Sequence, residues 1–378
     1  MRSNSHIVRT QLSRSLWVVR AAAVLSLLTG TALMATANAN ADNVFAQLPA
    51  LPGHPDNSMV GKDGNVYVTT NKGIDSNSGE PASVIYQLAP NGHLLRTFTI
   101  TGQDVANNHG LLGMAQDAAG RLYVADFAPP RVLRINLRTG RQETYAPMPD
   151  LPACAPVAPG DPLGQWCDNS GGTDSIPFPD VLAFDPAGNL YVTDLQQGTI
   201  FRIRPRTRRV EIWSQDAQFI SPFGPNGIAF DARGAVVVST TATVFGPTTV
   251  PDGGGRGGLF HLAVHRDGSA GPAVRFFTSK PGAAPQGFAI AASGSIYLSD
   301  CLTNELQVVS PDGTLVRSWG PDAAGTGVGL DCPSSVSFTR NSILVTNLAY
   351  LTVKTDHYTV LKIAAGERGL APTRPSVP

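Results

Sequence analysis

The stretch PDVLAFDPAGNLYVTD at residues 179–194 holds two apolar runs joined by a polar turn. Asp, Pro and Gly at its centre favour a tight turn, and the runs on either side have the length and composition of strands. Five further stretches repeat this frame: PDNSMVGKDGNVYVTT from residue 55, LLGMAQDAAGRLYVAD from 111, PNGIAFDARGAVVVST from 225, PQGFAIAASGSIYLSD from 285, and the shorter PSSVSFTRNSILVTN from 333.

Each repeat has room for two more strands. The repeats lie 46 to 68 residues apart, measured between their turn residues Gly64, Gly120, Gly188, Gly234, Gly294 and Asn341. After the stretch that ends at residue 194, the apolar runs IFRIRPR and VEIWSQ follow. Repeats of roughly 40–50 residues with several strands each are typical of a β-propeller. The sequence predicts an all-β fold, a six-bladed β-propeller with four-stranded blades that forms a single domain at residues 42–378.

The two ends of this domain are expected to meet. The last repeat continues with YTVLKI at residues 358–363 and then a Pro-rich tail, so its blade lacks a fourth strand. NVFAQLP at residues 43–49 precedes the first blade and has no place in it. We expect this N-terminal strand to pair on the outside of the last blade, which removes an open sheet edge.

Residues 1–41 have the pattern of a secretory signal peptide. Four Arg precede the apolar run AAAVLSLLTGTALM, and two overlapping A-N-A sequences follow it. Such a leader predicts a secreted or periplasmic protein. Its removal leaves 24 basic and 28 acidic residues, a net charge of −4 (28 − 4 = 24; 24 − 28 = −4). That balance argues against nucleic acid as a partner, and against a membrane after signal cleavage. A small-molecule ligand or substrate remains the expected partner.

The four cysteines of an exported chain are expected to form two disulfides. Cys154 and Cys167 flank a Pro/Gly-rich loop, which leaves Cys301 and Cys332 as the second pair. Free buried thiols are the alternative. A zinc site is disfavoured because the chain has no CxxC spacing with nearby His.

One position of the repeat changes from blade to blade in a way that suggests a site. It follows the repeated Pro, at the start of the innermost strand and hence at one mouth of the central channel. Oxygen donors converging on one point suit a hard cation such as Ca²⁺. Pro-Asn-Gly at residues 225–227 is also an ordinary turn former, so a purely structural role stays open. We call these positions the slot ring: Asp56, Leu112, Asp180, Asn226, Gln286 and Ser334.

The P-x-G and GxLYVxD frames resemble the senescence-marker-protein, gluconolactonase and strictosidine-synthase-like superfamily of six-bladed propellers. The resemblance covers nearly the whole chain after the leader. It implies one divalent ion in the channel, held by a Glu of the first blade, two Asn of middle blades and an Asp of a P-D-G turn. Asn226 matches the second Asn, and Asp180 stands at the first. Asp56, or nearby His54, replaces the Glu, and Gln286 replaces the Asp.

Two functions follow. The first is a metal-dependent hydrolase of a sugar lactone or related ester, with Asp56, Asp180 and Asn226 as metal ligands. His109 in NNHGLLG resembles a paraoxonase His and is a candidate general base, as is Asp180. Gln286, Ser334 and the loop residue Phe223 would contact substrate. The alternative is a non-catalytic ligand-binding propeller without a metal, which the missing Glu and the presence of Gln286 favour.

Overall fold

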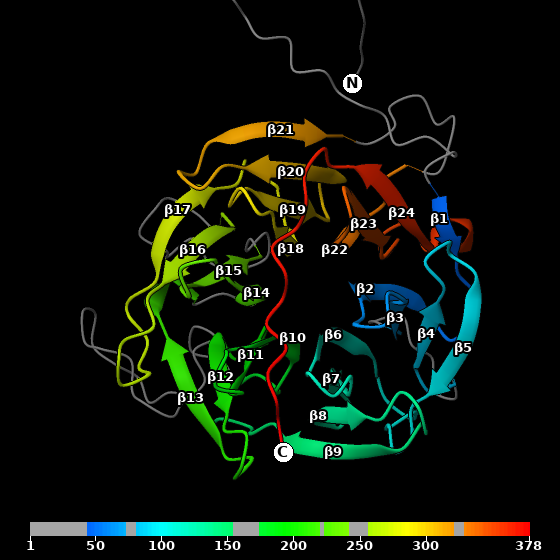
Figure 1. The fold of residues 1–378 in the computed structure, drawn as a ribbon, viewed down its shortest axis with the longest axis horizontal. Helices are drawn as coiled ribbons and strands as arrows, with labels where there is room; N and C mark the ends of the chain where they lie inside the picture. Colours follow the sequence, from blue (N-terminus) through cyan, green and yellow to red (C-terminus); the bar gives the residue numbers. More distant parts are fainter. Residues whose placement is uncertain (1–43, 73–80, 154–173, 220–222, 242–255, 321–328) are drawn as a thin grey trace, which may run out of the picture. The chain divides into compact units, whose positions relative to one another are not determined.

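The computed structural model describes residues 44–72, 81–153, 174–219, 223–241, 256–320 and 329–378. These residues form six four-stranded antiparallel sheets around one axis, which confirms the predicted six-bladed propeller (Figure 1). Two single-turn 3-10 helices, Ala217–Phe219 and Thr355–His357, interrupt the strands. In this described part, no helix is long and apolar enough to cross a membrane.

Five blades follow the order of the sequence from the inside outward. The first consists of β2 (His54–Val60), β3 (Val66–Asn71), β4 (Val84–Leu88) and β5 (Leu94–Thr99). The second consists of β6 (Leu111–Gln116), β7 (Leu122–Phe127), β8 (Pro130–Ile135) and β9 (Gln142–Pro147). The third consists of β10 (Pro179–Phe184), β11 (Leu190–Asp194), β12 (Thr199–Ile203) and β13 (Val210–Gln215).

The remaining blades repeat this arrangement, except at the closure. The fourth consists of β14 (Pro225–Phe230), β15 (Val236–Thr240), β16 (Gly258–Leu262) and β17 (Val274–Thr278). The fifth consists of β18 (Pro285–Ile290), β19 (Ile296–Asp300), β20 (Glu305–Val309) and β21 (Leu315–Trp319). The sixth consists of β22 (Pro333–Thr339), β23 (Ser342–Asn347), β24 (Thr359–Ala364) and, on its outside, β1 (Val44–Gln47).

Burial explains why the second strand of each blade is a nearly unbroken apolar run. Every residue of β3, β7, β11, β15 and β19 is buried, because neighbouring blades cover both faces of the sheet. Aromatic rings join adjacent blades; the Tyr123 ring meets the Phe184 ring edge-on, with centroids 4.9 Å apart. The outer strand β5 is mostly exposed. The core therefore lies between blades rather than along the channel.

The N-terminal strand closes the ring as predicted. Ala46 pairs with Val360 across β1 and β24, and the Leu48 amide donates to the Tyr358 carbonyl at 2.8 Å. Ala46 and Leu48 are buried in a core cluster shared by the first and last blades. The closing strand thus joins the two ends of the chain by both backbone hydrogen bonds and apolar burial.

A disulfide joins Cys301, which follows β19, to Cys332, which precedes β22, as the sequence predicted. It ties the fifth blade to the sixth. The second predicted pair, Cys154 with Cys167, lies outside the described residues.

The C-terminal tail crosses the face of the propeller that carries the tight turns, a feature the sequence did not predict (Figure 1). The Leu370 amide donates to the Ile290 carbonyl of the fifth blade at 2.8 Å, and the Ala118 amide of the second blade donates to the Pro375 carbonyl at 2.9 Å. Val377 is buried against the second and third blades. The tail therefore spans the channel at the mouth opposite the slot ring.

Removal of residues 44–49 tests the closure. It takes away four strand residues and the buried Leu48 side chain, and it exposes the β24 edge, so we expect the free energy of unfolding to fall by about 3–5 kcal/mol. Leu48→Ala should cost about 2–3 kcal/mol of the same quantity. Urea unfolding of the three proteins, each without residues 1–43, measures this. Equal midpoints for the truncated and intact proteins would contradict the closure.

Candidate functional site

The slot-ring residues sit at a bulge in every innermost strand. In β10, Pro179 faces Asp194 of β11 and Leu182 faces Val192, so three steps on one strand match two on the other. One residue is therefore extra, and a bulge of this kind re-aims a side chain. The same one-residue excess occurs in the other five blades. Residues 225–227 lie in β14 rather than in a turn, so the turn interpretation of Pro-Asn-Gly is wrong.

Hydroxyl groups of the second strand satisfy the backbone at this bulge. The Thr193 hydroxyl accepts from the Val181 amide at 2.9 Å and donates to the Asn226 carbonyl of the next blade at 2.6 Å. Ser239 repeats this pattern with the Gly227 amide at 2.8 Å and the Gln286 carbonyl at 2.6 Å. Thr69 does so with the Asn57 amide at 3.0 Å and the Leu112 carbonyl at 2.9 Å. Each hydroxyl thus links one bulge to the next blade.

Close approach of the blades explains a glycine after the slot position. A Cβ on Gly113 would lie 2.7 Å from the Asp180 carbonyl oxygen, and one on Gly287 would lie 2.8 Å from the Ser334 carbonyl oxygen. Real side chains do not tolerate such contacts with backbone. These glycines therefore allow neighbouring slot positions to pack together, rather than shaping a turn.

The slot ring is buried. Asp56 is 9% exposed, Asp180 5% and Asn226 3%, and Gln286 is half-buried. Leu112 is buried too and interrupts the ring of polar groups at the second blade. Every blade except the second therefore contributes a polar slot residue at this level of the channel.

The charged forms of the two carboxyl groups of the slot ring, Asp56 and Asp180, are destabilised by burial. Asp180 Oδ2 is buried and has no hydrogen-bond partner among the described residues. Burial, and then the charges of Asp56 and Asp194, raise the pKa of Asp180 well above its ordinary value. Burial also raises the pKa of Asp56 to about 7, against the lowering effect of a 3.1 Å hydrogen bond from Asn71. Both carboxyl groups therefore lack the positive partner that would stabilise their charge.

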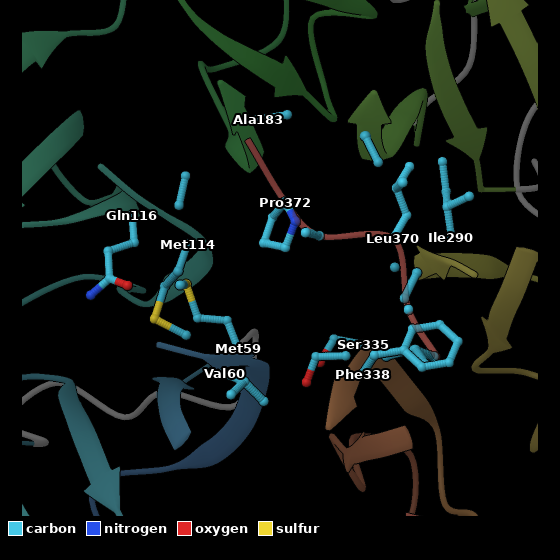
Figure 2. A pocket seen from close by; sticks show the side chains of 18 of the residues that line it. Met59, Val60, Met114, Gln116, Ala183, Ile290, Ser335, Phe338, Leu370 and Pro372 are labelled. Carbon is cyan, nitrogen blue, oxygen red and sulfur yellow. The ribbon is translucent and has the colours of Figure 1, made fainter. Parts of the chain in front are cut away.

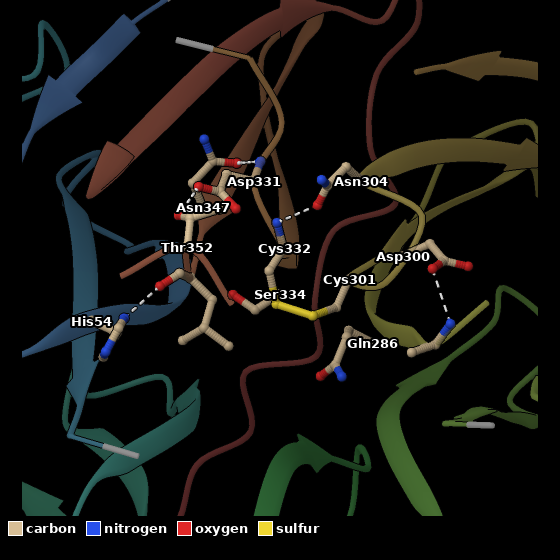
Figure 3. The surroundings of a disulfide bond; sticks show 12 residues. His54, Gln286, Asp300, Cys301, Asn304, Asp331, Cys332, Ser334, Asn347 and Thr352 are labelled. Atoms are coloured by element: carbon tan, nitrogen blue, oxygen red, sulfur yellow. Dashed lines mark hydrogen bonds between the residues drawn. A yellow bond between two sulfur atoms is a disulfide. The ribbon is translucent and has the colours of Figure 1, made fainter. Parts of the chain in front are cut away.

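The amide members of the ring bind each other. Asn226 Nδ2 donates to Gln286 Oε1 at 2.9 Å and to the Thr241 hydroxyl at 3.3 Å. Within the described part of the chain, Asn226 Oδ1 accepts no hydrogen bond and remains the free oxygen of this pair. Ser334, by contrast, donates its hydroxyl to the Asp56 carbonyl. Figure 3 shows Ser334 and Gln286 on either side of the Cys301–Cys332 disulfide.

The donor set has the chemistry of a hard-cation site. Its members are two carboxylates, an amide oxygen and a half-buried Gln, and an unpaired buried carboxylate oxygen is what a bound cation would stabilise. The described residues contain no group of three or more His, Cys, Asp or Glu placed to hold a metal. The residues therefore fit a cation only if an amide oxygen takes part, as Asn226 Oδ1 would.

His109 is fully buried, at the end of the connection that leads into β6. Its Nδ1 lies 2.9 Å from the Asn107 carbonyl oxygen and its Nε2 lies 3.1 Å from the Pro81 carbonyl oxygen. Both ring nitrogens of His109 thus face backbone acceptors. To act as a general base, His109 would have to lose one of these contacts. Its catalytic role stays a prediction, as does substrate contact by the half-buried Phe223.

His54, the alternative to Asp56 in the first blade, is also occupied. Its Nδ1 lies 2.8 Å from the Leu348 carbonyl oxygen and its Nε2 lies 3.3 Å from the Tyr358 hydroxyl. The imidazole of His54 therefore joins the first blade to the last. Asp56 is the first-blade group that the structure leaves for the channel.

The Asp at the end of the second strand holds the neighbouring connections in the third and fifth blades. Asp194 accepts from the Gln197 amide at 2.9 Å and the Phe178 amide at 3.1 Å, and Asp300 accepts from the Ala284 amide at 2.9 Å. These carboxylates fix the connections around the mouth, although the charge of Asp194 also reaches Asp180.

Comparison with known proteins supports the fold. No protein-family model and no curated protein matches the chain. Regucalcin from Agrobacterium tumefaciens strain C58, described as a calcium-binding protein, is similar with a TM-score of 0.57 and 13% identity, over 91% of this chain and 98% of its own. A gluconolactonase from Xanthomonas campestris gives 0.52 and 15%, over 82% and 88%. The chain has their fold. The resemblance predicted from the sequence is thus confirmed at the level of architecture, and the chemistry rests on the residues of the ring.

The buried carboxyl groups predict how stability depends on pH. Their pKa values are higher in the folded chain than in the unfolded chain, so the unfolded chain releases protons that the folded chain keeps. The free energy of unfolding of the ion-free protein should therefore fall as the pH rises from about 4 through 7, by a few kcal/mol. Urea unfolding in chelator, across this range, measures the slope.

Asp180→Asn separates this site from other buried acids. The amide cannot ionise, so the variant should lose less stability than the wild type over the same pH range. Asp150→Asn changes an exposed carboxyl and is the matched control. An unchanged slope in Asp180→Asn would show that the carboxyl is not strained by its surroundings.

Proposed function

We propose that this protein is a Ca²⁺-dependent hydrolase of a lactone or related ester, with its site at the slot ring. The observation that carries the proposal is Asp180 Oδ2, a buried carboxylate oxygen without a partner in the described structure, in the electrostatic field of a second buried carboxyl group, Asp56. A divalent cation would compensate both charges. The fold shared with regucalcin and a gluconolactonase supports the proposal without establishing it.

Asp56 and Asp180 would hold the ion through carboxylate oxygens, and Asn226 through its free Oδ1. Gln286 keeps the Asn226 amide in this orientation, because Gln286 Oε1 accepts a hydrogen bond from Asn226 Nδ2 at 2.9 Å. A bound divalent ion polarises a substrate carbonyl and lowers the pKa of a coordinated water. The chain's part is to hold these oxygens in place at one mouth of the channel before the substrate binds.

Proton transfer would fall to Asp180 or His109. Burial, and then the charges of Asp56 and Asp194, raise the pKa of Asp180 well above its ordinary value, which suits a group that takes up and releases a proton. His109 is held by the Asn107 and Pro81 carbonyls, so Asp180 is the better-placed group as the chain stands. Gln286 and Ser334 would then contact the substrate at the mouth, with Phe223 on the adjoining loop.

We further propose that the protein works outside the cytoplasm, secreted or periplasmic, on a small molecule. The leader-like N-terminal sequence suggests export. The Cys301–Cys332 disulfide supports it, because such bonds persist in oxidising compartments.

A binding propeller without a metal is the second candidate. The Asn226–Gln286 hydrogen bond favours it, since two amides that pair with each other need no ion. In that case Asn226, Gln286 and Ser334 would form a polar surface for a ligand. The two functions differ in whether a cation is needed.

Calorimetric titration of Ca²⁺ into metal-stripped protein distinguishes them. We expect one saturable site in the wild type, at least a tenfold loss of affinity in Asp56→Asn and in Asp180→Asn, and no change in the Asp150→Asn control, because each ring variant removes a charged oxygen ligand. Lactone hydrolysis, followed by acid release on a panel of sugar and aliphatic lactones, should then require Ca²⁺. Absence of binding at millimolar Ca²⁺ would reject the hydrolase and leave the binding propeller; Ca²⁺ binding without hydrolysis would reject the reaction alone.

A further inference from the structure

A cavity occupies the channel on the far side of the slot ring. It has a volume of about 460 Å³ and lies between the innermost strands and residues 368–374 of the C-terminal tail (Figure 2). None of the slot-ring residues lines it. Its volume is in the range of small-molecule sites, about 300–1,000 Å³. The cavity is therefore a separate space, enclosed on one side by the tail.

Apolar side chains form most of the wall of this cavity. In β10, Val181 and Ala183 are half-buried and line the cavity, and they also pack against the core cluster of the third and fourth blades. Met59, Ile290 and other apolar residues of the innermost strands continue this surface, with Leu370 from the tail (Figure 2). Apolar surface that faces a void lacks the contacts of a packed core, and a ligand could supply them.

The charged groups around the cavity are all positive. Arg340, Arg368 and Arg374 line it, and no Asp or Glu of the described residues does. Arg374 Nη2 donates to the Val60 carbonyl at 2.7 Å, but its Nε is buried without a partner in the described structure. Burial lowers the pKa of this guanidinium, with Asp63 acting through space in the opposite direction. The cavity therefore presents positive charge with no opposing acidic residue among the described residues that line it.

Two hydroxyl groups of the wall are also unsatisfied. Ser58 Oγ and Ser337 Oγ are buried and have no hydrogen-bond partner among the described residues, although both residues line the cavity. Ser58 is only 3% exposed. Buried polar atoms normally find a partner. With Arg374 Nε, these hydroxyl groups give the wall hydrogen-bonding capacity that a ligand with acceptor oxygens would use once the side chains turn toward the cavity.

We propose that this cavity binds an apolar carboxylate of the medium-chain fatty-acid type, with its carboxylate on Arg374 and its chain along Met59, Met114 and Phe288. The volume equals about fifteen waters at roughly 30 Å³ each, which suits a ligand of about that number of non-hydrogen atoms. The guanidinium gives a charge-assisted hydrogen bond at one end, and burial of the chain adds affinity at the other. This site is independent of the proposed hydrolase site.

Calorimetric titration with decanoate, in chelator so that the slot ring holds no Ca²⁺, tests the proposal. We expect one saturable site in a chain that lacks the leader, and at least tenfold weaker binding of decanol, which has the same chain without the charge. Arg374→Gln should weaken decanoate roughly tenfold and leave decanol nearly unchanged. Arg206→Gln, an exposed Arg away from the cavity, is the matched control and should bind as the wild type does.

Ala183→Leu tests the location. The larger side chain occupies the cavity, so decanoate and decanol should both lose affinity, at least fivefold. Arg340→Gln, at the exposed rim, gives a smaller loss and serves if Arg374→Gln unfolds at a lower temperature than the wild type. No saturable decanoate binding would overturn the proposal. Equal affinity for decanol, or full affinity in both Ala183→Leu and the arginine variants, would overturn it as well.

Discussion

The hydroxyl groups at the inner bulges are the contacts on which the rest of this propeller depends. A bulge leaves a backbone amide without its ladder partner, and a buried amide without a partner destabilises the fold. Thr69, Thr193 and Ser239 each accept from such an amide and donate to the slot carbonyl of the following blade. One side chain therefore stabilises its own strand and fixes the distance to the next blade. The slot side chains are directed into the channel because their backbone is held in this way.

The hydroxyl contact at the bulge differs at two places in the slot ring. The second blade has Ala125 in the hydroxyl position and Leu112 in the slot, so both polar groups are absent together. Between the last blade and the first, the slot hydroxyl of Ser334 itself donates to the Asp56 carbonyl, while Ser335 accepts from the Ser58 amide. The closure of the ring thus uses a slot residue for structure. This makes Ser334 a weaker candidate for substrate contact than Gln286.

The features that could be predicted from the sequence are mainly those that follow from the repeated frame. Six copies of one frame fixed the number of blades, and the leftover strand at residues 43–49 fixed the closure. Cys301 was left to pair with Cys332 once Cys154 and Cys167 were assigned to one loop. The bulge was missed because its signal is a small residue, such as Gly287, which also favours turns. The Asn226–Gln286 hydrogen bond was missed because it joins residues 60 positions apart in different blades. The tail has no periodic pattern, so its course over the blades is known from its contacts in the structure, such as those with Ile290 and Ala118.

The two ends of the channel differ in charge, and this difference follows from topology. Each innermost strand begins at the slot ring, where Asp56 and Asp180 lie, and ends at the tight turns, where the tail brings Arg368 and Arg374 beside Arg340. Neither set of charges has a full complement of opposite charges in the described structure, which is why we propose a cation at one end and an anion at the other. The tail supplies two of the three arginines. A propeller with the same six repeats and no tail would keep the acidic end and lose most of the basic one.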